Sequence, residues 1–245
     1  MTTLSLILPC YNEAERLPAT LGAHLAQLAG DPGQAEVVIV DDGSTDATAA
    51  VAEAVAATDA RVRVIRTEPN HGKGFAVRTG MLAASGELLV FTDADGSYGP
   101  GEVERVVSAL ADNPVAIGTR VHDRTSGTLG RRIASRVFNR TLRLLLRLPF
   151  RDTQCGLKGF RREVARELFG RARVDGFAFD VEVLLLARRL GLAVAEVPVR
   201  AQERDGSRVR LLLDGRRMLG EVWAARQAAA SEAAVTPVSA LPFSE

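Results

Sequence analysis

Asp93 and Asp95 are the residues whose type and spacing most directly suggest chemistry. They follow the stretch 87–92, an apolar run with Val and Phe between Gly86 and Gly96 that is typical of a short buried strand. Side chains two residues apart share a face of a strand, and a turn at the strand end can bring both carboxylates toward one ion. Their oxygens suit Mg²⁺ or Mn²⁺, which commonly bridge to substrate phosphates. Taken alone, the pair fits a solvated turn that closes a strand equally well.

Three further clusters of polar residues and glycines, 10–13, 41–44 and 70–74, follow or closely adjoin predicted strands in the same way. The predicted strands are 4–9, 36–40, 62–65, 87–92 and 115–118. They alternate with helices and are apolar on both faces, which favours an α/β fold with a mostly parallel sheet flanked by helices on both sides. Because ligands of such sheets bind beyond the carboxyl ends of the strands, the shared placement of the four clusters indicates a single site.

The helices that should alternate with these strands have recognisable start signals. We expect Asn12, alone or with Glu13, to cap a helix over 14–29, and Ser44, Thr45 or Asp46 to cap an Ala-rich helix that ends near 58. Later elements are expected as helices over 71–84, 102–111 and 177–190 and as an edge strand over 193–199. The tail 231–245 is rich in Ala, Ser and Pro, and we expect it to be disordered.

Charge and cysteine content restrict the function classes. The chain has 245 residues with a net charge of +1, so no overall field is directed at nucleic acid. Arginines are nevertheless dense between 120 and 151, and they form a stripe on an expected amphipathic helix over 131–148; a second such helix is expected over 210–229. The stripe fits either solvated arginines or a basic helix that lies on an anionic membrane or lines a phosphate site. Two cysteines make no disulfide framework, and no apolar run reaches the ~18 residues of a membrane span, so we expect a cytoplasmic or peripheral protein.

The ordered set of motifs resembles the family 2 glycosyltransferases of the GT-A fold over about residues 4–120. It consists of Pro9-Cys10-Tyr11-Asn12-Glu13, Asp41-Asp42-Gly43-Ser44, Asn70-His71-Gly72-Lys73-Gly74 and Asp93-Ala94-Asp95-Gly96. The later stretches 151–160, 177–182 and 205–208 resemble the dolichyl-phosphate glucosyltransferase branch, which extends the likeness to about residue 225. Two departures are an N-terminal membrane helix that is not seen here and Arg208 where that branch usually has lysine. The resemblance implies one GT-A domain over 1–230, with a nucleotide-sugar half over 1–119 and an acceptor half over 120–230.

The resemblance also implies roles for individual residues. It implies that Asp93 and Asp95 hold a Mg²⁺ or Mn²⁺ ion on the donor diphosphate, and that Arg120, or Arg131 second, binds the acceptor phosphate. Asp152 is the acid expected near the reacting centre, where it would act as general base if the acceptor were a hydroxyl. The residues implied in donor binding are Pro9, Tyr11, Glu13, Asp41, Asp42, Gly72, Lys73, Asp93, Ala94, Asp95, Arg204 and Arg208.

Three details of this assignment depend on residue type. Gly72 and Gly74 are expected to let the backbone approach the nucleotide, and Asp46 is expected to cap a helix. Of Asp180 and Glu182, we expect one to face the site and the other to lie on the helix surface. The two lysines of the chain, Lys73 and Lys158, both lie inside the matched motifs, which suggests positions where arginine's planar fork would not fit.

The function implied is inverting transfer of a hexose, glucose from UDP-glucose, to a polyprenyl phosphate at the cytoplasmic face of a membrane. Alternatives within the fold are transfer of mannose from GDP-mannose, and transfer to a soluble or protein hydroxyl. A sugar-phosphate nucleotidyltransferase should carry a Gly/Arg/Lys signature after the first strand, and residues 9–13 lack it. A non-catalytic sugar-nucleotide binding module would be expected to lose a metal carboxylate, and both are present here.

Overall fold

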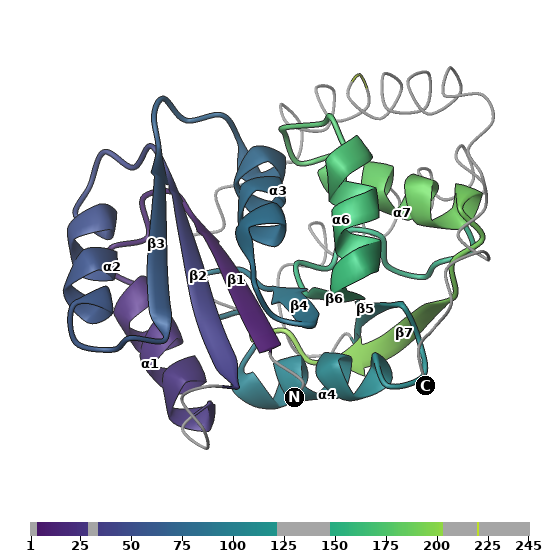
Figure 1. The fold of residues 1–245 in the computed structure, drawn as a ribbon, viewed down its shortest axis with the longest axis horizontal. Helices are drawn as coiled ribbons and strands as arrows, with labels where there is room; N and C mark the ends of the chain where they lie inside the picture. Colours follow the sequence, from purple (N-terminus) through teal and green to yellow (C-terminus); the bar gives the residue numbers. More distant parts are fainter. Residues whose placement is uncertain (1–3, 29–33, 122–147, 203–219, 221–245) are drawn as a thin grey trace, which may run out of the picture.

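The computed structural model describes residues 4–28, 34–121, 148–202 and Gly220, and these form a layered α/β structure around one sheet (Figure 1). The strands are β1 (Leu4–Cys10), β2 (Ala35–Asp42), β3 (Val62–Thr67), β4 (Leu88–Phe91), β5 (Val115–Arg120), β6 (Lys158–Arg161) and β7 (Val194–Val199). The helices are α1 (Leu17–Gln27), α2 (Thr48–Ala56), α3 (Lys73–Ala83), α4 (Pro100–Ala109), α6 (Arg162–Arg171) and α7 (Phe179–Arg189).

The sheet has seven strands in the order β3-β2-β1-β4-β6-β5-β7. All neighbouring pairs are parallel except those of β6, which runs antiparallel to both β4 and β5. The expected α/β class with a mostly parallel, helix-covered sheet is therefore confirmed, and β7 confirms the expected edge strand over 193–199.

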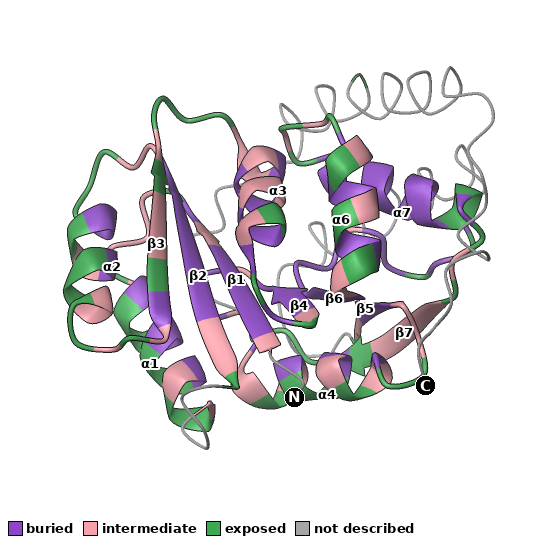
Figure 2. Cartoon of the chain, viewed as in Figure 1, coloured by how far each residue is buried: buried purple, intermediate pink, exposed green. Residues whose placement is uncertain are grey.

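Two cores, one on each face, explain why the central strands are apolar throughout. On β1, Leu6 and Leu8 pack in the core that contains residues of α1, α2 and α4, whereas Ile7 between them packs in the core of α3, α6 and α7. Val37 and Val38 of β2 divide in the same way. Figure 2 shows these strands as buried along most of their length. Each large side chain buried in this way contributes roughly 1.5–3 kcal/mol of hydrophobic free energy, so the sheet centre is rigid support for the loops at its ends.

Two expected helix starts are wrong in detail. Helix α1 begins at Leu17 and is preceded by Arg16, which makes no side-chain cap, so Asn12 does not cap it. Helix α2 begins at Thr48 after Ala47. Asp46 still acts as expected in part, because its carboxylate accepts the backbone N–H of Thr48 at 2.9 Å, the first residue of that helix.

Strand β6 and helix α6 were not predicted from the sequence. The four residues of β6 include Lys158 and Gly159, which have weak strand propensity, and the strand is held by pairing with β4 and β5. Helix α6 buries Val164, Ala165, Leu168 and Phe169, a helical spacing that was readable in the sequence.

Several expectations fall on residues outside those that the structure describes. These are most of the amphipathic helices over 131–148 and 210–229, and the tail 231–245. The division of a single domain into halves at residue 119 also stays a prediction. Within the described ranges, no helix combines the length and the apolar character that crossing a bilayer requires.

Candidate active site

The predicted clusters meet at the carboxyl-end edge of the sheet. The register pairs Cys10 with Asp41 at the ends of β1 and β2, and Phe91 at the end of β4 with Lys158. Because β6 runs antiparallel, its first residue, Lys158, lies at the edge where its neighbours end. The ends of the parallel strands β1 to β5 and the start of β6 therefore bring these side chains to one candidate site.

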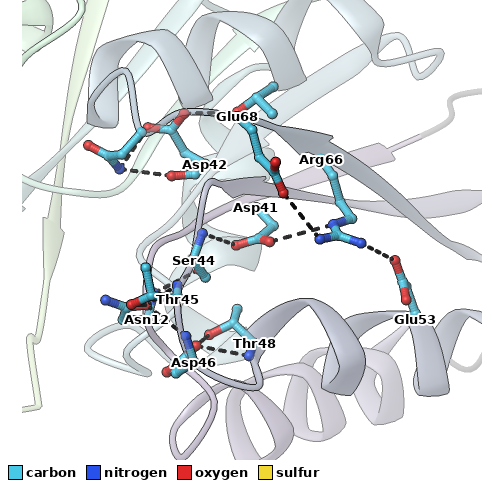
Figure 3. Close-up of polar contacts among 12 residues, drawn as sticks. Asn12, Asp41, Asp42, Ser44, Thr45, Asp46, Thr48, Glu53, Arg66 and Glu68 are labelled. Carbon is cyan, nitrogen blue, oxygen red and sulfur yellow. Dashed lines mark hydrogen bonds and ion pairs between the residues drawn. The ribbon is translucent and has the colours of Figure 1, made fainter.

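Asp41, near the end of β2, is 2% exposed. Figure 3 shows its carboxylate between the Ser44 loop and the side chain of Arg66. Its Oδ1 accepts the backbone N–H of Ser44 at 3.3 Å, and its Oδ2 lies 4.0 Å from Nε of Arg66 on β3. Arg66 is half exposed and also pairs with Glu53 and Glu68. Each carboxylate oxygen has two lone pairs, so Asp41 retains the capacity to accept an N–H or hydroxyl from a ligand.

Asp42 is committed to the protein's own backbone. Its carboxylate accepts the backbone N–H groups of His71 at 3.0 Å and Gly72 at 2.7 Å, as well as the hydroxyl of Thr67 at 2.9 Å. The amide of Asn70 donates to it at 3.0 Å. Asp42 therefore holds the 70–72 turn in front of α3, and a direct contact with the donor stays a prediction.

Asn12 joins the two loops that follow β1 and β2, a role that the sequence did not suggest. Its φ of 56° is in the left-handed region, which Asn tolerates better than most residues. From there its Oδ1 accepts the backbone N–H groups of Thr45 at 2.7 Å and Asp46 at 3.2 Å, and its own N–H donates to Ser44 Oγ at 2.8 Å (Figure 3). This bracing places Tyr11, which is 41% exposed, beside the 41–46 loop.

Pro9 and Glu13 frame the same segment. Pro9 is part of β1 and partly buried. Glu13 donates its backbone N–H to Thr48 Oγ1 at 2.7 Å and pairs through its carboxylate with Arg16 at 2.5 Å. Their contact with the uridine stays a prediction.

Gly72 and Gly74 let a protein segment, 174–176, come close. A Cβ at Gly72, whose φ is 119°, would lie 2.5 Å from the carbonyl oxygen of Asp175, and one at Gly74 would lie 2.7 Å from Cβ of Phe179. The same carbonyl of Asp175 accepts the backbone N–H of Gly74 at 2.7 Å, at the first turn of α3. The glycines thus fix the start of α3, and their approach to a nucleotide stays a prediction.

Asp93 and Asp95 follow the end of β4 on a loop of residues 92–97, here called the acidic loop, which turns at Gly96, where φ is 76°. Both are partly buried, with the buried Ala94 between them. Asp93 Oδ1 lies 2.6 Å from Nζ of Lys73, the first residue of α3. Asp95 Oδ1 accepts the backbone N–H of Ser97 at 2.9 Å.

This donor set fits a divalent ion. Mg²⁺ and Mn²⁺ are held by one or two carboxylates together with waters and substrate phosphates, which is what two neighbouring aspartates at a sheet edge can provide. Among the residues that the structure describes, no group of three or more His, Cys, Asp or Glu side chains could hold a metal by itself. A metal at Asp93 and Asp95 would therefore need oxygens from a substrate or water.

Arg120 and Asp152 form a bidentate ion pair beside this loop. Nε and Nη2 of Arg120 donate to the two oxygens of Asp152 at 2.6 Å and 3.0 Å. Burial would raise the pKa of Asp152, but the hydrogen bonds and charge of Arg120 outweigh it and lower this pKa. For Arg120, burial would lower the pKa, yet Asp152 raises it above its ordinary value. The predicted acid and the predicted phosphate-binding arginine are thus brought together, and Asp152 is a weak base.

Lys158 and Asp180 make a second, fully buried pair next to the first. Nζ of Lys158 donates to Asp180 Oδ1 and to the carbonyl of Cys155, each at 2.6 Å. Burial raises the pKa of Asp180, and the neighbouring ammonium groups of Lys158 and Lys73 partly offset this. Both lysines of the chain therefore contribute to this site.

The expectation that Asp180 or Glu182 would lie on the helix surface is wrong. Both are buried: Asp180 pairs with Lys158 at the start of β6, and Glu182 is bonded to the 173–174 segment. Glu182 accepts the backbone N–H groups of Arg173 and Val174, at 3.0 Å and 2.8 Å. Glu182 thus holds the segment that packs on Gly72 and Gly74.

Three predicted arginines, Arg131, Arg204 and Arg208, lie outside the described residues. The chain that leads to the last two passes the acidic loop, since Gln202 donates its backbone N–H to the carbonyl of Ser97 at 2.8 Å. Their roles stay predictions.

Comparison with known proteins agrees with this geometry. The family model described as Glycosyl transferase family 2 matches residues 5–169, more than half of the chain. The chain belongs to glycosyl transferase family 2. Its relatives in this family include the dolichyl-phosphate beta-glucosyltransferase of Drosophila melanogaster, 42% identical over 229 residues that cover 84% of this chain and 69% of that protein. The enzymes of that name from Homo sapiens and Saccharomyces cerevisiae are 37% and 32% identical, over 84% and 92% of this chain and 69% and 74% of theirs.

Solved structures of the same fold include glucosyl-3-phosphoglycerate synthase from Mycobacterium tuberculosis. Its complex with Mn²⁺, UDP and glucosyl-3-phosphoglycerate has a TM-score of 0.70 at 22% identity and covers 91% of this chain and 80% of that chain. Its complex with Mn²⁺ and UDP-glucose has a TM-score of 0.69 at 23% identity, with coverage of 91% and 79%. At this identity the likeness concerns the fold, and it confirms the GT-A architecture that the motifs implied.

Proposed function

We propose that this family 2 member is an inverting, metal-dependent transferase that moves glucose from UDP-glucose to a polyprenyl phosphate. The observation that carries the proposal is the identity of 32% to 42% to dolichyl-phosphate beta-glucosyltransferases, over 84% to 92% of the chain. Attack on the anomeric carbon from the side opposite UDP inverts its configuration.

The Arg120–Asp152 pair supports an acceptor that is already an anion. A hydroxyl acceptor must lose a proton in the reaction, so it needs a general base within reach. Asp152 is the acid nearest this role, but Arg120 occupies both of its oxygens and lowers its pKa. A phosphate acceptor needs positioning instead, and the guanidinium of Arg120 has further N–H donors for a phosphate oxygen.

Asp93 and Asp95 are the residues that would hold the metal, with Mn²⁺ or Mg²⁺ as the candidates. Mn²⁺ and UDP-glucose in the M. tuberculosis enzyme of the same fold support this choice. When bound, such an ion offsets the negative charge that develops on the leaving diphosphate. Asp41, with Pro9, Tyr11 and Glu13 around it, is proposed to accept from the uracil or the ribose.

The remaining parts of the proposal concern residues outside those described. Arg204 and Arg208 follow Gln202, whose N–H is bonded to the acidic loop, so they would close over the diphosphate. Arg131 and the arginine stripe behind it would bind the acceptor phosphate and the anionic headgroups of the cytoplasmic membrane face. Attachment is then peripheral.

The test is transfer of radiolabel from UDP-glucose, UDP-galactose and GDP-mannose to polyprenyl phosphate in detergent, with and without Mn²⁺ or Mg²⁺. We expect a metal-dependent, organic-extractable product from UDP-glucose alone. A lipid product from GDP-mannose would contradict the donor, and donor hydrolysis without any lipid product would contradict the acceptor. Arg105→Met is the control variant and should transfer glucose like the wild type. It removes a positive charge from an exposed side chain on α4 that pairs with Glu102 of the same helix.

A further inference from the structure

Lys73 places an ammonium group on a carboxylate that the proposed function assigns to the metal. Its Nζ lies 2.6 Å from Asp93 Oδ1, and the two side chains are 21% and 27% exposed. A metal ion on the same oxygen would sit at about 2.0–2.1 Å and would bring two cationic centres together. The ammonium and the metal therefore compete for Asp93.

The backbone of Lys73 cannot easily withdraw to relieve this competition. Lys73 begins α3, whose first turn is held by the carbonyl of Asp175, and Gly72 before it is held by Asp42. What can move is the side chain, a compact charge on a flexible four-carbon stem. Lys73 can therefore exchange one anionic partner for another within the reach of its stem.

Charge determines which partner it takes. Asp93, Asp95 and Lys73 together carry one net negative charge, and the adjacent Lys158–Asp180 pair adds none when both are ionised. A divalent ion alone would turn that set positive. A divalent ion that binds together with a diphosphate, which carries about two negative charges, leaves the net charge of the set at one negative charge. The diphosphate also gives the ammonium group of Lys73 a new anion to bind.

We propose that Lys73 is a positioning residue that makes metal binding depend on the donor: it occupies Asp93 when the site is empty and moves to the diphosphate when metal and donor bind together. This inference rests on the proposed metal-dependent function. By linkage, the donor must tighten metal binding by the same factor by which the metal tightens donor binding. The lysine thus disfavours a metal ion bound without substrate.

The test compares the wild-type chain with Lys73→Met by titrating Mn²⁺ and following the electron paramagnetic resonance signal of the free ion, without UDP and with a fixed concentration of UDP. Without UDP, we expect Lys73→Met to bind Mn²⁺ about tenfold or more tightly than wild type, because a cation about 4 Å or less from the metal position is gone. With UDP, the variant should bind Mn²⁺ no more tightly than wild type. Arg105→Met, which removes an exposed positive charge on α4, should not change either affinity.

The outcomes separate this inference from the function on which it rests. Equal Mn²⁺ affinities of wild type and Lys73→Met without UDP, with normal Mn²⁺ binding in the presence of UDP, would overturn the role of Lys73 and leave metal dependence intact. Absence of Mn²⁺ binding in every protein, with and without UDP, would overturn the metal-dependent function itself. Far-ultraviolet circular dichroism of each variant establishes that a changed affinity does not come from unfolding.

Discussion

Gly156 is the residue whose substitution most directly tests the geometry of the acidic loop. A Cβ built on it lies 2.7 Å from Cγ of Asp93 and closer still to Oδ2, whereas ordinary contacts begin near 3.4 Å. In Gly156→Ala the carboxylate must therefore shift by on the order of 1 Å, and a shift of that size can cost about 10²-fold in rate. The side chain of Asp93 can rotate away, so the cost to folding should be about 1 kcal/mol.

The assay is steady-state glucosyl transfer together with urea unfolding of the same preparations. We expect kcat to fall about 100-fold, equivalent to about 2.7 kcal/mol of transition-state stabilisation, with little change in the unfolding midpoint. Gly170→Ala on α6 is the matched control, because a Cβ there meets nothing within 4 Å, and it should be fully active. Full turnover by Gly156→Ala would refute the placement of Asp93 at the reacting centre.

Three further predictions follow from single side chains. Asp95→Asn should abolish transfer while circular dichroism stays unchanged; near-normal turnover would remove its metal role. Burial lowers the pKa of His24 from 6.5 to about 4, although a hydrogen bond with the backbone of Tyr98 acts in the opposite direction. As pH falls, His24 therefore takes up a proton in the unfolded chain before it does so in the folded protein. The free energy of unfolding should thus decline as pH falls from about 6.5 to 4, by up to about 3 kcal/mol. In His24→Gln the urea midpoint should no longer decrease in this way, and an unchanged pH dependence would contradict the role of His24. Arg120→Met leaves the buried Asp152 carboxylate without its bidentate partner and should cost about 3 kcal/mol or more in unfolding free energy. Adding Asp152→Leu to Arg120→Met should recover much of this free energy. No recovery would argue against the unpaired carboxylate as the cause.

The site was predictable to the extent that its residues are linked to strand ends. Strands β1, β2 and β4 are apolar on both faces, and in a parallel sheet their carboxyl ends share an edge, so the strand pattern alone places Asp41 and Asp93 at the same edge. The roles of Asp42 and Asn12 could not be predicted, because each depends on which backbone N–H groups a distant loop presents. For Asp42 those groups are about 30 residues away in sequence, in the 70–72 turn.

Apolar periodicity and motif order are local properties of the chain, so they sufficed to predict the fold class, the family and the edge of the sheet that carries the candidate site. The pairing of the charges, in contrast, depends on tertiary packing. Lys158 reaches the site because β6 runs antiparallel, and Asp180 reaches Lys158 because α7 packs over that strand's start. Pairings of this kind depend on the packing of elements far apart in the chain, and Coulomb energies change steeply with distances that only packing sets.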